Sequence, residues 1–324
     1  MAQRSVKKLL VTSPMAVVAL GIGFMAQGLG SAPPTHDRRV LDSLIAAPAA
    51  PRPEAQAQRS SDLQGLQARR ALRRTGQGVD LAEPEAGAPV DLEIRVALLT
   101  RPSLPDLSAT GPWWLRNRGG ALLARGGPGQ PVGIGLDRSG EAELWLETGS
   151  SDRVLVQGRT YEGRIRLLRQ DNGWLAVNHL SLERYIAAVV GSEMPSGWEM
   201  EALRAQAVAA RSYALAHMAR PANTHWHLGD TTRWQAYRGS EAVNTRTRQA
   251  AASTRGIILS YQGGIVESLY AANRQISLEA HGHLGASMSQ HGAQELARSG
   301  RRYTQILASY YPGASLARLR RGAS

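Results

Sequence analysis

The sequence predicts an α+β fold, in which a β-rich N-terminal subdomain packs with a helical part built around a helix–corner–helix motif. Strand-like segments recur through residues 90–179, separated by clusters of Gly, Asn, Asp and Ser. Two helical patterns follow within residues 180–220, where apolar residues recur at steps of three and four. We therefore expect one domain over residues 90–319, with strands mainly before residue 180 and helices mainly after it.

The first 32 residues have the layout of a secretory signal peptide. Arg4, Lys7 and Lys8 precede an apolar stretch, and small residues before and at Ala32 form a cleavage site. The best apolar core, residues 15–25, is shorter than the roughly 20 residues that span a bilayer, which favours a cleaved signal over a retained anchor. We expect an exported protein of the periplasm or cell envelope, with membrane contact through the N-terminus as the alternative to cleavage.

Composition limits the possible chemistry and partners. The chain has no cysteine, so neither a disulfide nor a thiolate metal site can form. Its net charge of +12 is almost entirely arginine, since the only lysines are Lys7 and Lys8. Such a balance favours an anionic partner. For an exported chain we expect a membrane surface, a wall polymer or the carboxylates of peptidoglycan, and no nucleic acid.

Residues 33–89 are rich in Ala, Pro, Gln and Arg and contain no Phe, Trp or Tyr, which predicts a disordered linker. Beyond it, the expected strands cover residues 92–99, 121–125, 141–147, 154–157, 163–169 and 174–177. Trp113 and Trp114 are candidates for stacking on sugar rings from an exposed loop, with a buried structural role as the alternative.

The two helices of the central motif have different patterns. Apolar spacing predicts a short helix over residues 181–190. An alanine-rich pattern predicts a longer one that ends near Arg220, and Ser196 with Glu199 forms a capping box ahead of it. Between the helices, we expect a tight corner that is held by two rigid elements.

That corner carries Glu193. Gly191 permits a sharp break, and Pro195 moves Met194 out of the helical region. The corner is a good mounting for a reactive carboxyl group, while a solvated loop acid is the alternative. Apolar and aromatic neighbours would raise the pKa of the carboxyl group, and we expect these to be Met194, Trp198 and Tyr185.

The remaining elements follow in order. We expect helices over residues 243–253, 289–298 and 304–311, and a hairpin that pairs 257–260 with 265–270. The chain ends with a solvated basic tail over residues 320–324, which also includes Arg318. His225 and His227 with Asp230 suggest a metal site only weakly, since ordinary polar loop residues are the commoner explanation.

Several motifs resemble the SpoIID/LytB family of peptidoglycan-acting proteins. They are N-H-L-S-L-E-R-Y-I from residue 178, S-E-M-P from 192, the helix around 198–215, D-T-T-R-W-Q-A-Y-R-G over 230–239, and the closing motif over 281–293. The family contains lytic transglycosylases and amidase enhancers. The resemblance implies that Glu193 is the catalytic acid. It also implies candidate substrate-binding residues, for which a cap or packing role is the alternative: Arg211, Gln235, Tyr237, His283, Ser289 and Gln290.

The chain departs from the family after residue 271, where the insertion of many relatives is missing. The resemblance therefore does not carry over the family's zinc site, and we assign no metal and no cofactor. A single carboxyl group suits a lytic transglycosylase, because ordinary glycosidases need two carboxylates. The alternative is a non-catalytic peptidoglycan-binding protein that enhances or activates a cell-wall amidase. In both cases the expected partner is the glycan strand.

Overall fold

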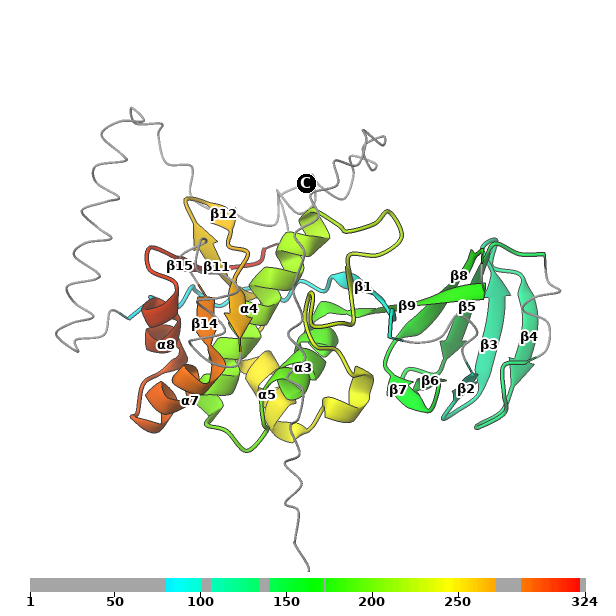
Figure 1. The fold of residues 1–324 in the computed structure, drawn as a ribbon, viewed down its shortest axis with the longest axis horizontal. Helices are drawn as coiled ribbons and strands as arrows, with labels where there is room; N and C mark the ends of the chain where they lie inside the picture. The colour runs from blue at the N-terminus through cyan, green and yellow to red at the C-terminus, as the bar shows by residue number, and fades with distance from the viewer. Residues whose placement is uncertain (1–79, 101–105, 134–139, 172, 272–286, 321–324) are drawn as a thin grey trace, which may run out of the picture. The chain divides into compact units, whose positions relative to one another are not determined.

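The computed structural model describes residues 80–100, 106–133, 140–171, 173–271 and 287–320, which all lie in one unit over residues 35–324 (Figure 1). The signal peptide or anchor predicted for residues 1–32, the linker up to residue 79, and His283 lie outside the described residues. Within the described ranges, no helix combines the length and hydrophobicity needed to cross a membrane.

The β-rich part is built on a seven-stranded sheet with the order β10-β1-β9-β8-β5-β3-β4. Neighbouring strands are antiparallel, except that β1 pairs with β10 in parallel. Alternate residues such as Leu144 and Leu146, or Ile165 and Leu167, are fully buried, as the two-residue period of a strand requires. The strands are β1 (Glu93–Ala97), β3 (Trp113–Asn117), β4 (Leu122–Gly126), β5 (Glu143–Thr148), β8 (Arg164–Gln170), β9 (Gly173–Ser181) and β10 (Leu228–Gly229).

A smaller sheet in the same part joins β2 (Leu107–Ala109), β6 (Val154–Val156) and β7 (Arg159–Tyr161) in the order β2-β6-β7. The six strands predicted before residue 180 are confirmed with shifted ends, while β2, β3 and β7 were not predicted. The exposed-loop interpretation of the Trp pair is wrong. Both residues lie in β3, and Trp113 is buried with its Nε1 donating to the Gln130 carbonyl at 3.1 Å.

Helices make up the second part (Figure 1). The long helix α4 contacts α3, α5, α7 and α8, and almost all its side chains are buried. A helix surrounded on all sides needs small residues, which explains the alanine-rich sequence. The helices are α3 (Leu182–Glu193), α4 (Met200–Ala219), the short 3₁₀ helix η1 (Gly239–Ala242), α5 (Thr245–Ser253), α7 (Gln290–Arg298) and α8 (Tyr303–Tyr310).

Two details of the predicted corner are wrong. Glu199 itself is the N-cap of α4 and makes no side-chain cap hydrogen bond, so there is no Ser196–Glu199 capping box. Gly191 does not break the chain, because α3 continues through it to Glu193. A Cβ atom at Gly191 would collide with the Ala242 carbonyl, so glycine is needed here for the close approach of α3 and η1.

Short strands complete the domain. The strand β11 (Ile257–Tyr261) pairs with β12 (Gly264–Ile265) and with β15 (Ser315–Arg318), whereas β13 (Leu269–Ala271) pairs in parallel with β14 (Ser287–Ser289). The predicted hairpin is therefore confirmed only near its turn. Arg318 was wrongly placed in the tail: it lies in β15, and its guanidinium donates to the Glu85 and Arg255 carbonyls. Residues 80–89 have no helix or strand, yet Leu81 is buried in the core.

Candidate active site

Glu193 is the last residue of α3, and the extended conformation of Met194 ahead of Pro195 ends the helix there. Its Oε1 accepts a hydrogen bond from the Ala236 backbone N–H at 2.8 Å, and its Oε2 accepts one from Gln290 Nε2 at 3.1 Å. The carboxyl group is therefore half-buried and held by two segments that are distant in the sequence. This is not the environment of a solvated loop acid.

The surroundings of Glu193 raise its pKa above the usual value. Burial is the largest cause, and it outweighs the hydrogen bonds from Ala236 and Gln290 and the positive charge of Arg238, which all lower the pKa. Among the described residues, Arg238 is the only charged side chain that shifts the pKa of Glu193. A carboxyl group in this environment keeps its proton to a higher pH than a free glutamic acid does.

The corner after Glu193 is fixed from two sides. Arg246 of α5 donates from Nε to the Ser196 carbonyl at 2.8 Å and from a terminal nitrogen to the Trp198 carbonyl at 2.6 Å. The Glu199 backbone N–H donates to Gln294 Oε1 of α7 at 2.8 Å. Helices α5 and α7 thus hold the connection between α3 and α4 in one conformation.

A chain of hydrogen bonds joins Tyr185, Gln235 and Tyr270. Tyr185 donates to Gln235 Oε1 at 2.9 Å, and Gln235 Nε2 donates to the Tyr270 hydroxyl at 2.7 Å and to the Ala210 carbonyl at 3.1 Å. The negative charge of Glu193 raises the pKa values of both tyrosines, after burial as the main cause. The charge of Glu193 therefore acts on Tyr185, one of the neighbours that the sequence predicts.

Gln235 and Tyr237 are buried. Their placement therefore agrees with a role in packing and not with direct binding of substrate. The Tyr237 hydroxyl donates to Asn178 Oδ1 at 2.6 Å, and the residue is only 2% exposed, which leaves little surface for contact with a glycan. Together the two side chains anchor the segment between them, and so position the Ala236 N–H that binds Glu193. No side-chain signal in the sequence could have shown that backbone donor.

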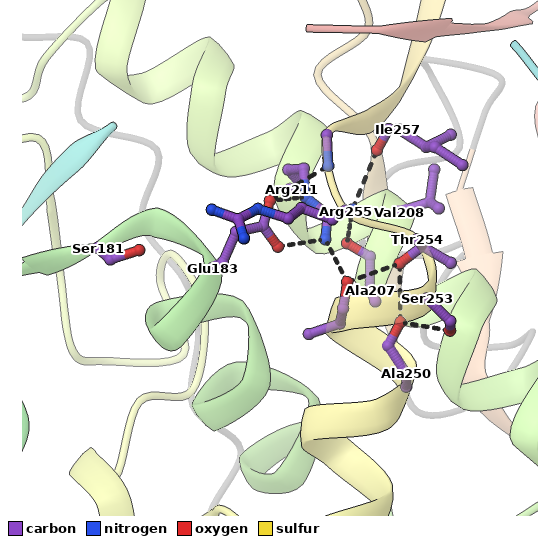
Figure 2. A network of polar contacts seen from close by, with 12 residues as sticks. Ser181, Glu183, Ala207, Val208, Arg211, Ala250, Ser253, Thr254, Arg255 and Ile257 are labelled. Atoms are coloured by element: carbon purple, nitrogen blue, oxygen red, sulfur yellow. Dashed lines mark hydrogen bonds and ion pairs between the residues drawn. The ribbon is translucent and has the colours of Figure 1, made fainter. Parts of the chain in front are cut away.

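Arg211 is also buried, at 0% exposure, and belongs to the network in Figure 2. Its Nε and one terminal nitrogen bind the two Glu183 oxygens at 2.9 and 2.7 Å. The other donors reach the carbonyls of Ala207, Ala251 and Ile257. All five N–H groups of the guanidinium are used within the protein. The structure thus places Arg211 as a buried link between α3, α4 and the end of α5.

Ser289 and Gln290 have different roles at the start of α7. Ser289 is buried, and its Oγ accepts from the Gly292 N–H at 3.1 Å, which is the helix-cap alternative. Gln290 instead points its amide at Glu193. Of the predicted binding residues, Gln290 alone contacts the candidate acid among those that the structure describes.

Two of the candidate metal ligands, His227 and Asp230, are engaged in other contacts. Arg95 donates from its backbone N–H to His227 Nδ1 at 3.1 Å, and its guanidinium contacts Nε2 at 3.0 Å. Asp230 accepts from the Leu99 and Thr100 N–H groups. No group of three His, Cys, Asp or Glu in the described ranges has the arrangement of a metal site. His227 and Asp230 thus connect this loop to β1 and the turn after it.

Comparison with known proteins relates these motifs to a family. Residues 170–261, which contain α3, α4 and the loop that binds Glu193, match the family model described as Stage II sporulation protein, SpoIID. This part of the chain is therefore similar to the SpoIID family. The SpoIID match thus includes Glu193, Gln235 and Tyr237 but ends before Gln290.

Proteins similar to this chain come from two bacterial genera. An uncharacterized protein of Brachyspira hyodysenteriae is 32% identical over 44% of this chain and 39% of its own length. The amidase enhancer of Bacillus subtilis is 31% identical over 43% of this chain and 19% of its own length. Stage II sporulation protein D of Bacillus subtilis is 32% identical over 29% of this chain and 32% of its own length. The chain spans less than half the length of each relative.

Proposed function

We propose that this chain acts on the glycan strands of peptidoglycan as a lytic transglycosylase, with Glu193 as its acid and base. The observation that carries the proposal is the half-buried Glu193 carboxyl group, whose pKa is raised by burial while two hydrogen bonds fix its orientation. The SpoIID match and the relative named amidase enhancer support a role at the cell wall. The N-terminal signal pattern supports action in the periplasm or envelope.

The proposed reaction uses one carboxyl group twice. Protonated Glu193 donates its proton to the glycosidic oxygen as the bond from that oxygen to the sugar C1 breaks. The resulting carboxylate then accepts the proton of the same sugar's 6-hydroxyl, whose oxygen bonds to C1 and closes an anhydro ring. No water enters, and Glu193 ends the cycle protonated. The donors on Ala236 and Gln290 stabilise the carboxylate between the two steps.

The charges near Glu193 favour this reaction over hydrolysis by two carboxylates. Hydrolysing glycosidases need a second carboxylate about 5–10 Å away. Among the described residues, the hydrogen-bond partners of the Glu193 carboxyl group are the Ala236 N–H and the Gln290 amide, not another carboxyl group. Asp230 and Glu267 each act on a tyrosine on which Glu193 also acts, and both have other partners. The Asp230 oxygens accept hydrogen bonds from Leu99 and Thr100, and Glu267 accepts one from Arg220.

A second candidate function is stimulation of a cell-wall amidase without glycan cleavage. Two observations favour it: the relative named amidase enhancer, and the engagement of both Glu193 oxygens by protein donors. In that function, the corner would be a contact site for glycan or amidase.

Product analysis tests the proposal. Purified peptidoglycan is incubated with the full chain, and the released fragments are analysed by mass spectrometry. Anhydro ends would support transglycosylation, whereas new reducing ends would indicate hydrolysis and contradict it. No fragments, together with faster release of peptides by an added amidase, would support the second candidate.

A further inference from the structure

A cavity of about 430 Å³ lies where helices α3 and α5 meet the loops around β6 and β7. Four arginines and two glutamates are its charged residues: Arg153, Arg184, Arg248, Arg255, Glu162 and Glu183. Formal charges alone give this lining a net charge of +2. Neither the family motifs nor the reaction at Glu193 assigns a role to it.

Both acids in the cavity are already paired. Glu162 binds Arg153 at 2.7 Å and Arg184 at 3.5 Å. Glu183 accepts two hydrogen bonds from Arg211, as Figure 2 shows, and one from the Gly256 N–H. Neither carboxylate is therefore available to neutralise a further cation.

The other two arginines of the cavity, Arg248 and Arg255, have no carboxylate partner among the described residues. Both are exposed, and within the described residues neither guanidinium takes part in a hydrogen bond or an ion pair. A guanidinium presents planar pairs of donors that match a carboxylate. The cavity thus offers two free cations beside acids that are already compensated.

The uncharged part of the wall is built from small side chains. Ala187 of α3, Ala251 and Ala252 of α5, and Val243 give it an apolar side, and Ser150 and Ser151 add two hydroxyl groups. Methyl-sized side chains next to free guanidinium groups suit a carboxylate carried on a carbon that bears a methyl group. A flat, multiply charged polymer would leave this apolar surface unused.

We propose that this cavity is a subsite for the carboxylate of a lactyl or alanyl group on peptidoglycan, bound by Arg248 and Arg255. Each N-acetylmuramic acid carries a lactyl ether that is either a free carboxylate or the attachment point of an alanine-containing peptide. The proposal rests on the glycan substrate proposed above. It adds recognition of the muramic acid residues, which a neutral chito-oligosaccharide lacks.

The position of the subsite suits an extended ligand. Glu183, at the edge of the cavity, and Glu193 lie ten residues apart on α3, which corresponds to about 15 Å along the helix axis. A strand bound at both places would therefore cover several sugars. The carboxylate subsite would then help to set which sugar reaches Glu193.

Binding measurements with the full chain test this subsite. Titration calorimetry compares three probes of matched glycan length: a chito-oligosaccharide, a peptide-free muramyl glycan, and the same glycan with its peptides. We expect the full chain to bind at least one carboxylated probe about tenfold more tightly than the neutral one. The peptide-free and peptide-bearing arms identify whether the lactyl or the peptide carboxylate is bound.

The double variant Arg248→Gln/Arg255→Gln should remove this preference and keep the affinity for the chito-oligosaccharide. A matched control, Arg125→Gln/Arg298→Gln, removes two exposed arginines outside the cavity and should keep the preference. Equal affinity of the full chain for all three probes, or a preference that survives the cavity variant, would overturn the subsite alone. Absence of binding to every probe would overturn both the subsite and the proposed glycan substrate.

Discussion

The side-chain amide of Gln290 donates a 3.1 Å hydrogen bond to the Glu193 carboxylate, across 97 residues of sequence. Gln290 is the first residue of α7, and Glu193 is the last residue of α3. The contact therefore joins the end of one helix to the start of another at the candidate acid. Its presence lowers the pKa of Glu193 and so partly offsets the effect of burial.

Replacing Gln290 should change the pH dependence of glycan cleavage. In Gln290→Leu, the carboxylate loses a donor, so the pKa of Glu193 should rise further above its usual value. The loss of activity at high pH should then move to higher pH, and the maximal rate should fall about tenfold as positioning weakens. Rates of anhydro-product release measured across a pH series check this. An unchanged pH profile would show that Gln290 does not act on Glu193.

The variant Ser289→Ala tests whether Ser289 caps helix α7 or binds the substrate. Ser289 Oγ caps α7 by accepting from the Gly292 N–H. Its loss should lower the free energy of unfolding by about 1 kcal/mol. Urea unfolding measures this, and the pH profile of cleavage should stay that of the parent. Weaker glycan binding without a loss of stability would instead favour direct contact between Ser289 and the substrate.

Arg211→Met should act on stability. It leaves Glu183 without its bidentate partner, and removal of one member of a buried pair costs roughly 3–5 kcal/mol. The double variant Arg211→Met/Glu183→Leu should recover part of that loss. Urea unfolding of the two variants measures the difference. A single variant with parental stability but lost glycan affinity would contradict the structural role of Arg211.

His227 should make folding sensitive to acid. Burial, followed by the nearby charge of Arg95, lowers the pKa of His227 to about 3 from the usual 6.5. As the pH falls below 6.5, His227 takes up a proton in the unfolded chain but stays neutral in the folded chain, so the free energy of unfolding falls. The parent should lose roughly 2 kcal/mol more than His227→Gln between pH 7 and pH 5. Parallel stability curves from urea unfolding at each pH would contradict this.

Local patterns predicted the elements better than their contacts. Apolar spacing located α3 and α4, and alternation located β5, because one buried face leaves a periodic signal. The signal failed for β13, whose partner β14 lies beyond residues 272–286 and cannot be read from the sequence around either strand. It also failed for Trp113, since a strand residue and a loop residue of this type look alike in sequence.

The sequence predicted the acid of the candidate site, but it predicted the roles of the surrounding residues less well. The family motif indicated Glu193, whereas the local corner pattern alone fitted a solvated loop acid as well. Burial of Tyr237 and the complete use of the Arg211 donors depend on packing between distant segments, so motif matching could not separate structural from binding residues. The hydrogen bond from the Ala236 N–H to Glu193 could not be predicted from the sequence, because every residue except proline carries a backbone donor of this kind.

Glu193→Gln tests the central claim most directly when it is paired with a matched control. Glutamine can accept the Ala236 N–H through its oxygen and donate to Gln290 through its nitrogen, so fold and glycan affinity should stay close to those of the parent. Glu199→Gln makes the same chemical change six residues away, at an exposed side chain that makes no cap hydrogen bond.

The decisive measurement is mass spectrometry of the fragments released from purified peptidoglycan by the parent and these two variants. Our account predicts anhydro-ended fragments from the parent and from Glu199→Gln, and a loss of at least a hundredfold in Glu193→Gln, because an amide cannot exchange the required proton. Anhydro fragments from Glu193→Gln at the parental rate would contradict the assignment of Glu193 as the acid.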